Sequence, residues 1–264
     1  MTNALINFDS ANPNVTSGPI AVTGVSGTLL DIDQRPANGL LYGLSSTGGV
    51  YTINSSTGVA TQTSQIGIAL TGTQFAADFN PVVDRFRVLS NAGQSFIINV
   101  DNGSTVANTN LSTNTAVSNA YSNNFNGTTS TTLFDLTYNG TTFTLNSQVG
   151  ATGVVTPIGS NGISSVSSLV GFDISGQTGT AFVATNALAG AAGNIFTLST
   201  IDLTTGNVSS TTPILDGAIG FQVRGIAGNV GPNQAVPEPA SVAMLGLGLV
   251  GAGFVGRRRM ARSK

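Results

Sequence analysis

Short runs of apolar and β-branched residues, separated by turn residues, make up most of the chain before residue 240. The clearest group spans residues 28–66 and contains four such runs: Leu29–Asp33, Leu40–Leu44, Val50–Asn54 and Val59–Thr63. Tight-turn pairs separate the runs, as in Asn38-Gly39 and Thr57-Gly58. Four antiparallel strands within about 40 residues form a unit the size of one β-propeller blade. The pattern therefore predicts a four-stranded blade.

Turn signals of the same kind recur along the chain. Asn-Gly pairs favour the two-residue turns of β-hairpins. There are five of them: Asn38-Gly39, Asn102-Gly103, Asn126-Gly127, Asn139-Gly140 and Asn161-Gly162. No window before residue 240 has the periodicity of an amphipathic helix. These patterns predict an all-β body.

The first strand of this blade has counterparts further along the chain. We expect them near residues 75–80, 116–122, 169–175 and 219–225, at intervals of 47, 42, 52 and 50 residues. These intervals fit blades with loops of variable length. We therefore predict a five-bladed β-propeller over residues 1–230, with six blades as the alternative.

The fifth blade is shared between the two ends of this body. A Pro-rich segment begins at Val236, soon after its first strand, whereas Ala4–Asp9 and Ile20–Thr23 resemble third and fourth strands. Joining both ends in one blade removes exposed strand edges. We expect its second strand upstream of Met1, together with an export signal, because Met1–Ser10 lacks the cations and apolar core of such a signal.

The C-terminal end has a different composition. Residues 240–255 carry no charge, and five cations follow among the last eight residues: Arg257, Arg258, Arg259, Arg262 and Lys264. As a helix, residues 240–255 would be about 24 Å long, close enough to a hydrocarbon core of about 30 Å for snorkelling Arg side chains to complete the span. The alternative is a buried helix of the body, which would be apolar on all sides. We predict a transmembrane helix over residues 240–256 and a basic cytoplasmic tail over 257–264.

A linker over residues 231–239 precedes this span and ends in Pro237, Glu238 and Pro239. This triplet, one short apolar span and a terminal cluster with Arg257, Arg258 and Arg259 resemble the PEP-CTERM sorting signal of Gram-negative, exopolysaccharide-producing bacteria. The resemblance implies transient anchoring in the inner membrane and recognition by an exosortase. It also implies cleavage near the Pro-Glu-Pro triplet and release to the cell surface or the extracellular matrix of a biofilm.

The body carries a second resemblance. Residues 31–39, 41–44 and 78–88 resemble the signature of a bacterial domain of unknown function, which has propeller-like repeats and occurs in secreted proteins. The match fades after residue 125. It implies fold and export, and it implies no activity.

Composition excludes many kinds of active site. The 264 residues include no His and no Cys, and only 8% are charged. Catalytic triads with His or Cys, His-ligated metals, zinc thiolates and disulfide frameworks therefore lack their atoms. Before Pro237 there are four Arg against ten Asp, a net charge of −6, which disfavours binding to nucleic acid.

Seven of the fourteen charged residues of the body lie, together with Asn80, in two short segments of the first two blades. The residues are Asp31, Asp33, Arg35, Asp78, Asn80, Asp84, Arg85 and Arg87. We expect a structural network in which Arg side chains bridge Asp side chains and carboxylates cap backbone amides. A Ca²⁺ site is the alternative, although no Asp-x-Asp-x-Asp-Gly loop is present. We expect no other metal and no cofactor.

A glycosidase site is the competing hypothesis. Asp33, Asp78 and Asp173 lie on predicted first strands and would converge at the propeller axis, where one carboxyl could act as acid and another as base or nucleophile. An enzyme would have an axial pocket lined by these groups about 5–10 Å apart. A scaffold would have a narrow or filled channel. We favour an exported, non-enzymatic scaffold that binds matrix polysaccharide or protein.

Overall fold

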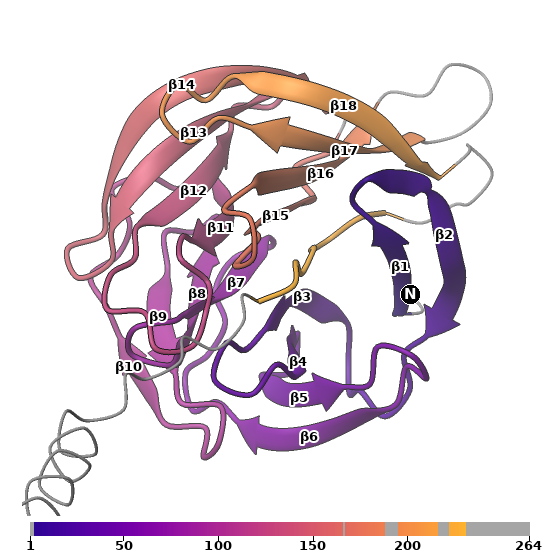
Figure 1. Cartoon of the computed structure of the whole chain (residues 1–264). Helices are drawn as coiled ribbons and strands as arrows, with labels where there is room; N and C mark the ends of the chain where they lie inside the picture. The colour runs from indigo at the N-terminus through magenta and orange to yellow at the C-terminus, as the bar shows by residue number, and fades with distance from the viewer. Residues whose placement is uncertain (1–2, 166, 188–194, 216–221, 231–264) are drawn as a thin grey trace, which may run out of the picture. The chain divides into compact units, whose positions relative to one another are not determined.

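The computed structural model describes residues 3–165, 167–187, 195–215 and 222–230, and its ordered elements are β-strands (Figure 1). Sixteen of the strands form four antiparallel sheets of four strands each. In order along the chain they are β3 (Leu29–Gln34), β4 (Leu41–Ser45), β5 (Gly49–Ile53), β6 (Ala60–Gln65); β7 (Phe75–Asn80), β8 (Arg85–Ser90), β9 (Ser95–Ile98), β10 (Thr105–Ala107); β11 (Ala116–Tyr121), β12 (Leu133–Tyr138), β13 (Thr142–Val149), β14 (Val154–Ser164); β15 (Val170–Ile174), β16 (Ala181–Ala187), β17 (Ile195–Ile201), β18 (Val208–Leu215).

Each sheet is a blade whose first strand is innermost. The innermost strands β3, β7, β11 and β15 pack side by side in that order. The segment 222–230 fills the remaining place between β15 and β3: a side chain at Gly171 of β15 would clash with Ile226, and one at Gly225 would clash with Asp31 of β3. The all-β fold and the five-blade arrangement are confirmed.

The fifth blade combines the two ends of the body. Strands β1 (Ala4–Asp9) and β2 (Asn12–Ala21) form a two-stranded sheet, and β2 contacts β18 of the fourth blade. A parallel bridge between Thr23 and Val59 joins the same end of the chain to the first blade. The hairpin thus occupies the outer two positions of a fifth blade, and residues 222–230 occupy the innermost one (Figure 1).

Part of the predicted fifth first strand, residues 219–225, lies outside the described residues, as do the predicted linker, transmembrane helix and basic tail over 231–264. Among the described residues, no strand pairs with the segment 222–230. Within the described ranges, the structure contains no helix of the length and apolarity that a membrane span requires.

Aromatic packing joins the first two blades. Tyr42 of β4 meets Phe79 of β7 edge to face, with ring centroids 5.3 Å apart, and Phe79 stacks on Phe86 of β8 at 4.6 Å. All three rings are buried, and Phe79 and Phe86 are fully enclosed. Such pairs add about 0.5–1.5 kcal/mol beyond the burial of their area. Phe79 is therefore a central packing residue between the blades.

We expect Phe79→Ala to lower the free energy of unfolding by about 3–5 kcal/mol, because it removes a fully buried ring and leaves a cavity. Urea unfolding followed by circular dichroism measures the change. Val83→Ala is the matched control, since Val83 is 53% exposed and its truncation should change stability by less than about 0.5 kcal/mol. Equal effects of the two variants would contradict this packing role.

Candidate functional site: the axial carboxylates

Three aspartates occupy equivalent positions on three innermost strands. Asp33, Asp78 and Asp173 each lie two residues before the first residue of a turn. In each of these turns, the carbonyl of that first residue accepts a hydrogen bond from the amide four residues later. Because the blades surround one axis, equivalent positions converge there. One carboxylate oxygen from each residue lies within 4.8 Å of the others. In the third blade, Ala120 takes the corresponding position.

These carboxylates link neighbouring blades through backbone amides. Asp33 accepts a hydrogen bond from the N–H of Phe79 at 2.8 Å, and Asp78 accepts one from Tyr121 at 3.1 Å. Asp173 accepts a hydrogen bond from the N–H of Gly228 in the segment 222–230. In each case the carboxylate lies on one blade and the amide on the innermost segment of the next.

Two of these side chains also bind their own strands. Asp33 accepts from the N–H of Gln34 and Asp173 from that of Ile174, both at 2.6 Å. Asp31, two residues before Asp33, repeats the pattern with Ala77 of the second blade at 2.8 Å. An innermost strand has no further strand on its axial side, so its amides need other acceptors. The aspartates supply those acceptors.

Burial dominates the electrostatics of this cluster. Asp33, Asp78 and Asp173 are each 1% exposed. Loss of hydration, followed by the charge of a neighbouring aspartate, raises the pKa of Asp33 and of Asp78 well above the usual range. Burial raises the pKa of Asp173 to about 6, against the opposing effect of the amides of Gly228 and Ile174. Three buried carboxylates this close cannot all be ionised without a compensating cation.

The cluster has two ways to reduce its charge: protonation, or a bound cation. Carboxylate oxygens are the ligands that Ca²⁺ prefers, although Ca²⁺ takes 6–8 oxygens in proteins. Asp33, Asp78 and Asp173 are the residues that could hold such an ion. Calcium binding stays a prediction.

Arg35 makes a separate connection between the first two blades. Its guanidinium bonds Asp84 at 2.8 and 2.5 Å and Asp101 at 2.7 and 2.9 Å, and it lies 5.8 Å from the ring centroid of Tyr42. The hydrogen bonds from Asp84 and then Asp101 raise the pKa of Arg35, and Arg35 lowers the pKa of Asp101. Bidentate pairs of this kind fix geometry as well as charge.

The other predicted network residues have local or inter-blade partners. Arg87 bonds the hydroxyl of Tyr121 on the third blade at 2.6 Å and Ser95 at 3.0 Å. Asn80 caps the amides of the turn that follows it, and Arg85 donates to the carbonyls of Val83 and Asp84. Arg85 therefore stays within its own turn and is not part of the axial cluster.

A second buried polar group lies in the third blade and was missed in the sequence. Asp135 is fully buried, which raises its pKa, and Gln148 donates to its two oxygens at 2.9 and 2.7 Å when its amide nitrogen faces them. Asn119 pairs with Asp135 across the strands. The side-chain amides of Asn119 and Asn124 have no hydrogen-bond partner among the described residues. The sequence signal that could have revealed this buried group is the presence of polar residues inside otherwise apolar strands.

Two family models match this chain, one over the body and one over the C-terminal segment. The family model named "Domain of unknown function (DUF4394)" matches residues 4–227. The chain therefore belongs to this family. The PEP-CTERM protein-sorting motif matches residues 235–259. This motif implies export, membrane-associated sorting in a Gram-negative bacterium and recognition by an exosortase.

The similar solved structures include one that is named as a propeller. The computationally designed Ika8 protein is 12% identical, with a TM-score of 0.38, and the match covers 75% of this chain and 51% of the Ika8 chain. The Dos1 propeller is 10% identical, with a TM-score of 0.42 and coverages of 72% and 49%. AofleA from Arthrobotrys oligospora is 15% identical, with a TM-score of 0.41 and coverages of 76% and 60%. This chain thus spans about half to three fifths of each structure. No curated protein matched it.

The raised pKa of Asp173 predicts a specific pH dependence. Its carboxyl binds a proton more tightly in the folded state, with a pKa of about 6, than in the unfolded state, with a pKa near 3.8. The free energy of unfolding should therefore fall as pH rises from about 4 to about 6, by an amount on the order of 3 kcal/mol. Urea unfolding at a series of pH values measures it.

Asp78→Asn tests whether the cluster causes this dependence. Its side-chain carbonyl can still accept a hydrogen bond from the N–H of Tyr121, while a buried carboxyl with a raised pKa is removed. The variant should therefore be more stable than the wild type at pH 7 and less sensitive to pH. Asp9→Asn is the control, because Asp9 is exposed. Stability that rises from pH 4 to pH 6, or equal pH profiles for Asp78→Asn and the wild type, would contradict the assignment.

Proposed function

We propose that the protein is an exported, non-enzymatic scaffold of the cell surface or extracellular matrix, which binds matrix polysaccharide or protein through its loops. The PEP-CTERM motif supports export and sorting. The single observation that supports a scaffold is the use of the axial aspartates. Their carboxylates accept hydrogen bonds from backbone amides of the neighbouring blade, so they hold the ring together. They are 1% exposed, so they are inaccessible to a substrate.

The Arg35 network supports the same proposal. Arg35 is buried and engages two aspartates from the second blade, so its charge is used inside the protein. Seven charged side chains of the body are buried, Arg35 among them, which leaves fewer ionic groups for its surface. Low surface charge suits a hydrated matrix, in which exposed ion pairs contribute little.

A glycosidase is the second candidate, favoured by the convergence of Asp33, Asp78 and Asp173. The burial of these carboxylates opposes it, because each is only 1% exposed and a sugar could not reach them without a structural change.

Processing of the C-terminus tests the exported role. In the native host, the mature protein in the surface or matrix fraction should end near Pro237–Pro239 and lack Arg257–Lys264, as intact-mass measurement will show. Replacing Arg257, Arg258 and Arg259 with Ala should reduce the processed fraction at least about threefold, because the cations retain the tail on the cytoplasmic side. Arg85→Ala, in the body, should be processed normally. A surface protein that retains its Arg tail would contradict the proposal.

A hydrolysis screen separates the scaffold from the enzyme. We expect purified protein to release no reducing sugar from host exopolysaccharide above the level of the Asp33→Asn and Asp78→Asn variants. The physical reason is that a general acid must reach the glycosidic oxygen, and these carboxyls are enclosed. Release by the wild type that both variants lose would instead establish the glycosidase.

A further inference from the structure

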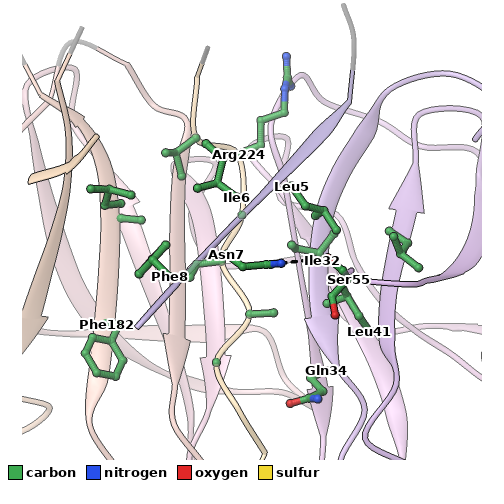
Figure 2. A pocket seen from close by; sticks show the side chains of 18 of the residues that line it. Leu5, Ile6, Asn7, Phe8, Ile32, Gln34, Leu41, Ser55, Phe182 and Arg224 are labelled. Carbon is green, nitrogen blue, oxygen red and sulfur yellow. Dashed lines mark hydrogen bonds between the residues drawn. The ribbon is translucent and has the colours of Figure 1, made fainter. Parts of the chain in front are cut away.

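A cleft of about 1700 Å³ separates the two parts of the fifth blade. Residues 3–10 of the β1 end line one side, and residues 222–229 of the innermost segment line another. The first blade contributes Ile32 and Leu41, and the fourth contributes Phe182 (Figure 2). The cleft therefore lies where the second strand of a complete blade would lie, between the innermost and third positions.

Both backbone edges along this cleft lack a partner strand. β1 pairs with β2 on its other side, and among the described residues neither β1 nor the segment 222–230 pairs with a strand across the cleft. In each complete blade one strand fills this place, namely β4, β8, β12 or β16. Adjacent strands lie about 4.8 Å apart, so one strand is what the missing place requires. Unpaired edges also recruit strands.

The walls of the cleft match a buried second strand. Phe8, Phe182, Val223 and Ile226 are only partly buried and pack against the core of the fourth blade. In the first three blades the second strands are mostly buried, and the four second strands are 5–7 residues long. An occupant of this length with apolar residues on both faces would cover the four partly buried side chains.

Chain order identifies the source of the strand. In all four complete blades the second strand directly precedes the third along the chain. The third strand of the fifth blade is β1, which starts at Ala4. We propose that the cleft holds a second strand of 5–7 residues, supplied by polypeptide encoded upstream of Met1 and antiparallel to β1.

Thiol labelling tests this proposal, because the chain contains no cysteine of its own. Phe8→Cys places a thiol in the cleft, and Val83→Cys places a control thiol at a turn residue that is 53% exposed. Each variant is made in two full-length forms in the native host. One is expressed from the native gene with its upstream coding sequence, and the other begins at Met1 after removal of a foreign export signal.

We expect the Phe8→Cys thiol to react with a maleimide at least about tenfold more slowly in the native-gene form than in the Met1 form, because an inserted strand must open before the reagent enters. The Val83→Cys thiol should react equally in both. N-terminal peptide mapping of the native-gene form should find residues upstream of Met1.

Three results would overturn the proposal. Equal, rapid labelling of Phe8→Cys in both forms would mean that the cleft stays open. Equal protection in both forms would mean that another polypeptide or another part of the chain fills it. A natural N-terminus at Met1 would remove the proposed source.

Discussion

The capping of axial backbone amides by aspartate carboxylates is the interaction on which the ring depends. Each innermost strand pairs with its own sheet on one side only, so its axial amides would otherwise be buried without acceptors, at about 1–3 kcal/mol each. Asp33, Asp78 and Asp173 meet this need across three of the boundaries between blades. The contacts are directional, so they also set the register of one blade against the next.

This arrangement concentrates negative charge where hydration is lost. The protein balances two opposing effects: hydrogen bonds from amides favour the carboxylate form, whereas burial and mutual repulsion favour the protonated form. Arg35 and Asp84 show the other solution, in which the opposite charge is supplied within the structure. The axial aspartates connect blades without such a partner among the contacts described for them, so their protonation state is coupled to the integrity of the ring.

Much of the fold followed from the sequence, because strand length and turn chemistry are local. The strands predicted over residues 28–66 agree with β3–β6 to within about two residues, and Asp33, Asp78 and Asp173 were expected to meet because equivalent positions converge on an axis. The acceptor role of Asp173 toward Gly228 could not be predicted, since it depends on a segment 55 residues away that has no strand ladder. The pairing of Gln148 with Asp135 could not be predicted either, because it requires the register of the β12–β13 hairpin.

The joining of both chain ends in one blade has a consequence for the timing of folding. Each of the four complete blades is a contiguous meander and can form as soon as its own residues are available. The contact between Asp173 and Gly228, by contrast, needs the last described part of the body. Among the described residues, 222–230 come last along the chain, so the circle closes only when they are available. Until then the first four blades form an open arc. The segment that closes the ring lies directly before the sorting motif in the sequence.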